Sequence, residues 1–246
     1  MKNKKSFVDS KLKFIDLCCG IGGFHYALKN MGHECVMASD IDEDCRNNYE
    51  LNHKLKPEGD LTKIDIKTIP NFDILCAGFP CQPFSKAGEQ KGFDDERGNI
   101  FFDICKIIKY HNPKYIILEN VRNLASHDKG NTWKVIQSKI DELNYYTYEK
   151  TVILNTLYFG VPQSRERVVI MCKRKDLGLL PDLPLISKEN IKNTSLENII
   201  EDNNKKEFKI SGKLKDTETI WNNFLDICKK NNIDIPRFPI WTDWWD

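Results

Sequence analysis

The sequence predicts an α/β fold in which helices cover both faces of a mostly parallel sheet. Short apolar runs alternate with amphipathic runs of helical length between Lys13 and Lys173, and this alternation is typical of such a sheet. The length of 246 residues allows one large domain or two small ones with a sizeable core. With 40% hydrophobic and 30% charged residues, the composition is that of an ordinary soluble protein.

Each expected element follows from its apolar pattern and from the turn residues that flank it. Strands are expected at the apolar segments 13–18, 34–40, 72–78, 114–120, 146–153 and 167–173. Helices are expected at the amphipathic segments 25–32, 43–53, 100–110, 132–143 and 219–232. Past Lys175 the sequence becomes rich in Asn and Lys. We therefore expect one domain at residues 1–175 and a variable region at 176–246.

Charge and cysteine content narrow the range of functions. A net charge of +1 means that any nucleic-acid binding depends on local basic patches rather than on a basic surface throughout. The nine cysteines include no C-x-x-C pair, which argues against a disulfide framework or a zinc site and favours a reducing compartment. No apolar run has transmembrane length and the N-terminus lacks a signal peptide. A cytoplasmic protein is expected.

The segment "DLCCGIGGF" places Gly20, Gly22 and Gly23 between a strand and a helix. Glycines there allow a tight turn that brings the backbone close to a ligand, although many such turns carry glycine for packing alone. The next strand ends at Asp40, where a carboxylate can accept hydrogen bonds from a ribose, and Asp60 follows another glycine. The acidic pair disfavours a polyphosphate, and either acid alone would be interpreted as a solvated loop residue. Together they fit a nucleoside with a zwitterionic tail, such as S-adenosylmethionine.

One cysteine differs from the others in its surroundings. Cys81 lies in "GFPCQPFSKAG", in a turn that Pro80 and Pro83 stiffen, directly after an expected strand. Ligands bind at the carboxyl ends of such strands, so the turn can present a thiolate. The alternative, a buried structural cysteine, fits Cys76 and Cys105 better because they lie within apolar runs.

Charged side chains accompany the ends of two further strands. Glu119 ends the strand at 114–120, and its carboxyl group can protonate a ring nitrogen. Arg165 and Arg167 precede a later strand and are separated by one residue, which points both to the same side of an extended segment. For each arginine alone, a surface position is the alternative.

These segments resemble the cytosine-5 DNA methyltransferases of bacterial restriction–modification systems. The blocks appear in the family's order: "FIDLCCGIGGF", "ASDID", "GDL", "GFPCQPFS", "LENVRNL" and "PQSRERVVI". The resemblance covers about Phe14 to Lys175 and continues between the blocks. It implies a Rossmann-like S-adenosylmethionine-dependent methyltransferase fold, with residues 1–175 as catalytic and cofactor-binding domain and double-stranded DNA as substrate.

The resemblance also implies roles for the charged residues and the cysteine. The family flips a cytosine out of the helix, Cys81 attacks carbon 6, and carbon 5 then takes the methyl group. Glu119 protonates or hydrogen-bonds ring nitrogen 3, while Arg167 binds the exocyclic oxygen with Arg165 close by. The loop after Cys81 closes over DNA, and the resemblance implies that Gln82, Ser85 and Arg97 contact the DNA.

For the cofactor, the resemblance implies a set of residues on the loops at the carboxyl edge of the sheet. They are Cys18, Gly20, Ile21, Gly22, Gly23, Asp40, Ile41, Asp60, Leu61, Gly78, Pro80 and Ile100. Two of them depart from the family, which has an aromatic residue at position 18 and a bulkier one at position 41. Loss of an aromatic face costs roughly 1 kcal/mol of stacking, so cofactor binding is expected to be weaker.

Nothing after Lys175 resembles the family's target-recognition domain or its final helix. A second polypeptide that carries these parts is therefore expected as a partner, and the tryptophan-rich terminus is interpreted as part of the surface it covers. The alternatives are an inactive truncated fragment that retains only cofactor binding and an RNA cytosine methyltransferase.

Overall fold

The structure is a computed structural model that describes residues 11–80, 100–183 and 212–233. The chain divides into two compact units, Met1–Ser195 and Leu196–Asp246. The boundary expected between residues 175 and 176 stays a proposal. Residues beyond it still contact the first unit, since the Tyr148 hydroxyl donates a hydrogen bond to the Pro181 carbonyl at 2.5 Å.

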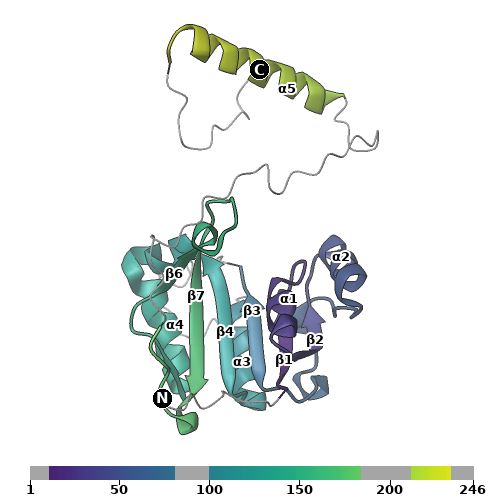
Figure 1. Cartoon of the computed structure of the whole chain (residues 1–246). Helices are drawn as coiled ribbons and strands as arrows, with labels where there is room; N and C mark the ends of the chain where they lie inside the picture. Colours follow the sequence, from purple (N-terminus) through teal and green to yellow (C-terminus); the bar gives the residue numbers. More distant parts are fainter. Residues whose placement is uncertain (1–10, 81–99, 184–211, 234–246) are drawn as a thin grey trace, which may run out of the picture. The chain divides into compact units, whose positions relative to one another are not determined.

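The first unit is built on a seven-stranded mixed sheet (Figure 1). Its strands are β1 (Lys13–Leu17), β2 (Glu34–Ser39), β3 (Ile74–Gly78), β4 (Tyr115–Val121), β5 (Tyr145–Thr147), β6 (Val152–Asn155) and β7 (Glu166–Arg174). They lie in the order β2-β1-β3-β4-β7-β5, and β6 also pairs with β7. The first four strands of this order are mutually parallel, whereas β7 is antiparallel to β4, β5 and β6. The predicted α/β fold with a mostly parallel sheet is confirmed.

One expected strand is wrong as predicted. The segment 146–153 forms no single strand but contributes to two, β5 and β6, which both pair with β7. Strand β7 has nine residues, so it is long enough to pair with two short strands in turn. Its carboxyl end pairs with β5 and its amino end with β6.

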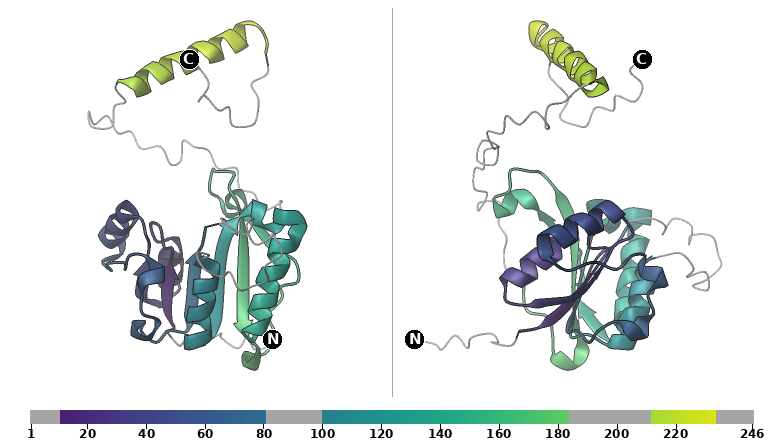
Figure 2. Two further views of the ribbon diagram at one scale, coloured as in Figure 1. Left: turned by 180° about the vertical axis from the view of Figure 1, so that it is seen from behind. Right: turned by 90° about the vertical axis from the view of Figure 1, so that its right-hand side faces the viewer.

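Four helices of the first unit cover the two faces of the sheet, as predicted. They are α1 (Gly23–Asn30), α2 (Glu43–His53), α3 (Ile100–His111) and α4 (Asn131–Glu142). Helices α3 and α4 lie on one face, where Ile104 and Ile136 join the main core. Helices α1 and α2 lie on the other side, where Leu28 packs with Phe14 (Figure 2). The carboxyl ends of β1, β2, β3 and β4 are thereby left at one edge, between the two helical layers.

The described part of the second unit is the amphipathic helix α5 (Lys213–Lys230). This helix begins six residues before the predicted start at residue 219. Within it, the rings of Trp221 and Phe224 stack with 5.3 Å between their centroids. In the part of the chain that the structure describes, no helix is long and apolar enough to cross a membrane.

Candidate active site at the carboxyl edge of the sheet

The glycine turn after β1 is held in an unusual backbone conformation. Gly20 and Gly22 have φ of +53° and +91°, a left-handed region that favours glycine. Cys18 has φ of +50°, a conformation uncommon for residues with a side chain. The turn is closed by a hydrogen bond from the Gly22 N–H to the Cys19 carbonyl at 2.9 Å, and helix α1 begins directly after it at Gly23.

Asp40 links the end of β2 to this turn. One carboxylate oxygen accepts a hydrogen bond from the Gly20 N–H at 2.7 Å, and the other accepts one from the Asp42 N–H at 3.0 Å. A carboxylate has about four acceptor positions, so Asp40 retains capacity for ligand hydroxyl groups. Arg46 donates to the carbonyl oxygens of Asp40 and Ile41 at 2.9 and 2.8 Å and fixes this loop. The sequence analysis missed Arg46, because no motif distinguishes it from the other polar residues of its helix.

The third loop of the predicted cofactor site carries Asp60 and Leu61. Asp60 accepts hydrogen bonds from the backbone and hydroxyl of Thr62 at 3.0 and 2.7 Å. Leu61 is buried in the main core, so its side chain supports the loop from beneath. By contrast, the side chains of Ile21 and Ile41 are 65% and 75% exposed at this edge.

The remaining predicted cofactor residues lie at or near the same edge. Gly78 ends β3, Pro80 is exposed two residues later, and Ile100 begins α3 and packs partly against the core. Cys18 is half-buried, and burial raises the pKa of its thiol to about 12. The donor set as a whole fits S-adenosylmethionine, because two carboxylates can meet hydroxyl groups while two exposed isoleucines offer apolar surface.

Glu119 and Arg167 form an ion pair between β4 and β7. The Arg167 Nε lies 2.7 Å from Glu119 Oε1, and the two side chains are 23% and 31% exposed. The pairing follows from strand register, since Glu119 is opposite Val169 and Val121 is opposite Arg167. Residues two apart share a face, which makes Glu119 and Arg167 diagonal neighbours.

The same carboxylate borders the strand that leads to Cys81. Gly78 is paired with Glu119 across β3 and β4. A Cβ at position 78 would lie 3.5 Å from Glu119 Oε2, so the carboxylate lies directly against this glycine. The structure therefore brings the Glu119–Arg167 pair to a point three residues along the chain from Cys81.

Asn120 ties β4 to the approach to Cys81. Its side-chain amide donates to the Phe79 carbonyl at 2.8 Å, its side-chain oxygen accepts from the Val121 N–H at 2.9 Å, and the residue is 2% exposed. A buried side chain with both ends satisfied positions its partner rigidly. The sequence reasoning missed this role, although Asn120 follows Glu119 directly in the "LEN" segment.

The two predicted arginines differ in their environment. Arg167 also donates to the Glu166 carbonyl at 2.8 Å, whereas Arg165 precedes β7 and is exposed. Arg122, just past β4, forms an ion pair with Glu166 that links the two strand ends. The other predicted residues, Cys81, Gln82, Ser85 and Arg97, lie outside the described residues.

Asp16 is a buried carboxyl group beneath the turn, and the sequence reasoning missed it despite its place in an apolar strand. It is fully buried, and neither of its oxygens has a hydrogen-bond partner of ordinary geometry in the described part of the chain. Loss of water contact raises the pKa of Asp16 from 3.8 to about 8. Nearby donors on His25 and Tyr49 lower it in part, and the negative charge of Asp40 adds to the rise. Asp16 is therefore neutral at pH 7.

This burial predicts how stability depends on pH. Between about pH 4 and pH 8 the unfolded chain loses the Asp16 proton while the folded chain keeps it. Each pH unit in that window lowers the free energy of unfolding by about 1.4 kcal/mol. In Asp16→Asn the side chain is neutral in both states, so the decline from pH 5 to 8 becomes shallower in urea-unfolding curves.

Asp60→Asn is the matched control. The hydrogen bonds from Thr62 lower the pKa of Asp60, so its contribution is constant from pH 5 to 8 and the decline keeps its slope. Parallel curves for Asp16→Asn and the unmodified protein would contradict a buried neutral Asp16.

Comparisons with known proteins show the family to which the chain belongs. The profile of the family described as C-5 cytosine-specific DNA methylase matches residues 12–235. The family match extends past Lys175 to residue 235. The type II methyltransferase M.HhaI of Haemophilus parahaemolyticus is 51% identical over 168 residues, which are 68% of this chain and 51% of that protein.

Two further relatives extend the comparison. The type II methyltransferase M1.ScrFI of Lactococcus lactis subsp. cremoris is 43% identical over 224 residues, which are 87% of this chain and 54% of that protein. The crystal structure of a DNMT2 mutant of Spodoptera frugiperda matches this fold with a TM-score of 0.63 and 27% sequence identity. The match covers 82% of this chain and 63% of that chain. The chain thus spans about half the length of the curated relatives it matches. It belongs to the C-5 cytosine-specific DNA methylase family.

Proposed function

We propose that this chain is the catalytic and cofactor-binding part of a DNA (cytosine-5) methyltransferase. Its substrates are S-adenosylmethionine and a cytosine flipped out of double-stranded DNA. The observation that carries the proposal is the Glu119–Arg167 pair against Gly78, at the end of the strand that leads to Cys81. Membership in the family and the fit of the cofactor loops support it.

The chemistry of cytosine explains why these groups are needed together. Carbon 5 is a poor nucleophile until a group adds to carbon 6, and we assign that addition to the Cys81 thiolate, the residue that follows Pro80 in the chain. As the S–C6 bond forms, negative charge moves toward ring nitrogen 3. Glu119 neutralises it in this proposal after it has taken up a proton on Oε2, the oxygen that the Arg167 Nε does not hold. Carbon 5 then takes the methyl group, and the sulfonium that carried it would leave as a neutral thioether. Carbon 5 loses its proton to a base, ring nitrogen 3 returns its proton to Glu119, and elimination releases the Cys81 thiolate.

Arg167 has two tasks in this scheme. Its Nε holds Glu119 Oε1, which leaves Glu119 Oε2 on the side of Gly78. The remaining N–H groups of the guanidinium can donate to the exocyclic oxygen of the base. The ion pair therefore orients the carboxyl group and binds the ring with the same side chain.

S-Adenosylmethionine supplies an electrophilic methyl group bound to a sulfonium. Asp40 and Asp60 are the residues that would accept hydrogen bonds from its hydroxyl groups and adenine, and Ile21 and Ile41 would pack on its apolar surfaces. The backbone of the glycine turn approaches it without side chains in the way.

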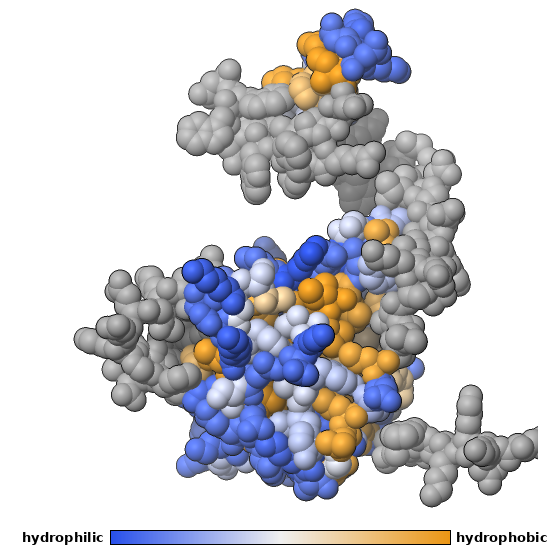
Figure 3. Space-filling view, turned by 90° about the vertical axis from the view of Figure 1, so that its left-hand side faces the viewer, coloured by the Kyte–Doolittle hydropathy of each residue, from blue (hydrophilic) through white to orange (hydrophobic). Residues whose placement is uncertain are grey.

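A second polypeptide completes the enzyme in this proposal. Several apolar side chains are exposed at the same edge of the sheet: Ile21, Ile41, Val121, Phe159 and Val161, at 38% to 75%. Figure 3 shows the α4 side of the first unit, where apolar patches lie among hydrophilic residues. Exposed apolar groups beside a site are typical of an interaction surface. That the partner also covers the tryptophan-rich terminus stays a prediction.

We predict a covalent adduct between Cys81 and the target base. With DNA that carries 5-fluorocytosine, carbon 5 has no removable proton, so elimination is blocked and the complex should survive denaturation. The reaction contains S-adenosylmethionine and the polypeptide encoded immediately downstream, and the adduct is detected as a shifted band on a denaturing gel.

Two variants decide the outcome. Cys81→Ser should abolish the adduct, whereas Cys45→Ser, which removes a thiol elsewhere in the first unit, should leave it intact. Methyl transfer by Cys81→Ser at the unmodified rate would show that the mechanism is wrong. An adduct on a matched RNA and none on DNA would favour an RNA cytosine methyltransferase.

The chain alone should have little or no methyltransferase activity. The catalytic edge by itself offers too few phosphate and base contacts for tight, specific DNA binding. Transfer of labelled methyl groups to mixed-sequence DNA should rise when the downstream polypeptide is titrated in. Full sequence-specific methylation by the chain alone would contradict the need for a partner. No activity with or without the downstream polypeptide would favour an inert fragment.

A further inference from the structure

Two histidines and a tyrosine form a packed cluster beside the glycine turn. His25 of α1 is 5% exposed and Tyr49 of α2 is fully buried. The His25 Nδ1 lies 2.7 Å from the Tyr49 hydroxyl oxygen. The ring of His53, at the end of α2, stacks on His25 with 4.1 Å between centroids and 22° between planes. It also contacts the Tyr49 ring at 4.6 Å, so two aromatic rings fix its orientation.

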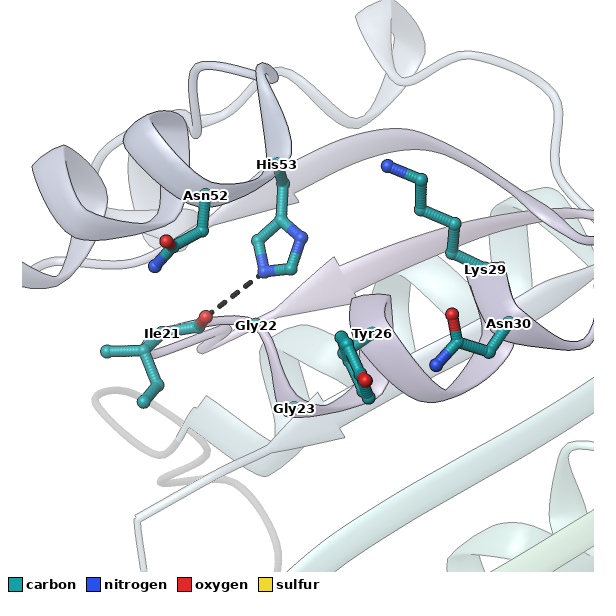
Figure 4. Close-up of a pocket in the computed structure, with 8 residues that line it drawn as sticks. All are labelled: Ile21, Gly22, Gly23, Tyr26, Lys29, Asn30, Asn52 and His53. Atoms are coloured by element: carbon teal, nitrogen blue, oxygen red, sulfur yellow. Dashed lines mark hydrogen bonds between the residues drawn. The ribbon is translucent and has the colours of Figure 1, made fainter. Parts of the chain in front are cut away.

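The other side of the His53 ring touches the turn. Its Nε2 lies 3.2 Å from the Ile21 carbonyl oxygen (Figure 4). A carbonyl oxygen only accepts, so Nε2 must carry the hydrogen in this contact. The approach is close, because a Cβ at position 22 would lie 2.1 Å from the same nitrogen. His53 therefore holds the turn from the α2 side, and the required glycine makes room for its ring.

The Ile21–Gly22 peptide is held at both ends: its N–H donates to the Cys19 carbonyl at 2.9 Å, and its carbonyl oxygen accepts from His53. A cavity of about 550 Å³ opens beside it, lined by Ile21, Gly22, Gly23, Tyr26, Lys29, Asn30, Asn52 and His53. The Ile21 side chain is 65% exposed, so core packing does not restrain it. Within the described part of the chain, the His53 contact is the side-chain hydrogen bond that fixes the Ile21 carbonyl.

The groups that face the cluster are mostly uncharged at neutral pH. Burial lowers the pKa of His25 to about 4, and its neighbours His53 and Lys29 lower it further. Asp16 beneath the cluster is neutral because burial raises its pKa to about 8. The Cys35 thiol lies 3.6 Å from the Tyr49 hydroxyl, and burial raises its pKa to about 11. The orientation of His53 is therefore set by packing and neutral hydrogen bonds.

We propose that His53 is a positioning residue for the cofactor: its Nε2–H fixes the Ile21 carbonyl and thereby the glycine turn that binds S-adenosylmethionine. The identity of the ligand rests on the proposed function, whereas the restraint on the turn does not. Removal of one such hydrogen bond should weaken cofactor binding about 5-fold. His53 touches the turn, so it acts through Ile21 rather than on the reacting atoms.

The experiment uses the full chain and two matched variants. His53→Phe keeps a ring that can stack on His25 but removes the N–H donor. His111→Phe is the control, because the His111 Nε2 forms the same kind of bond with the Ile66 carbonyl at 2.9 Å, at the end of α3. Titration calorimetry with S-adenosylmethionine should show about a 5-fold higher Kd for His53→Phe and an unchanged Kd for His111→Phe.

A second measurement needs no cofactor. Hydrogen exchange of the Gly22 and Tyr26 amides, which donate within the turn and into α1, should be faster in His53→Phe and unchanged in His111→Phe. Equal exchange in both variants would overturn the proposal, as would an unchanged Kd for His53→Phe. If the unmodified chain does not bind the cofactor, the proposed function fails, and the exchange rates still decide whether His53 restrains the turn.

A third measurement requires no substitution. Long-range nitrogen–hydrogen correlation spectra of the unmodified chain report which nitrogen of His53 carries the hydrogen. Hydrogen on Nε2 is the expected result. An unprotonated Nε2 would overturn the proposal even if His53→Phe failed to fold.

Discussion

The alignment of β3, β4 and β7 is the constraint on which the candidate site depends. Gly78 is paired with Glu119, and Glu119 is paired with Val169, so one carboxylate lies against the strand end that leads to Cys81 and beside Arg167. A shift of one residue would turn Glu119 to the opposite face. That face is filled by buried Ile116, Leu118, Val168 and Ile170, which hold the register. The apolar core therefore determines the geometry of the polar pair.

The neighbouring edge at β1 and β2 contains features that lower stability. Cys18 has a left-handed backbone conformation. Asp16 buries a carboxyl group that has no hydrogen bond of ordinary geometry to any residue the structure describes. Such features persist where the surrounding structure fixes them and are common at functional sites. Here the fixing contacts are the Asp40 carboxylate and the His53 ring, which hold the turn from two sides. The turn is thereby arranged before a ligand arrives, which reduces the ordering cost of binding.

Much of this organisation could be predicted from the sequence, because it depends on local patterns. The alternation of strands and helices predicted the α/β fold, whereas the contact between Glu119 and Arg167 follows from the register of β4 and β7. The split of segment 146–153 into two strands was not predictable, since it depends on the length of β7. Asn120, Asp16 and His53 act through contacts between residues distant in the sequence. No pattern along the chain reports such contacts. The one available sign was that Asp16 is a charged residue within an apolar strand.

The central claim is that Glu119 and Arg167 act on the base as one unit. A double-mutant cycle tests it most directly, with Glu119→Gln, Arg167→Met and the double variant compared in the rate of adduct formation with 5-fluorocytosine DNA. Melting temperatures of all three confirm that the fold is retained. If the two residues act together, the double variant is about as slow as the slower single variant. Effects that multiply, as for independent sites, would contradict the account.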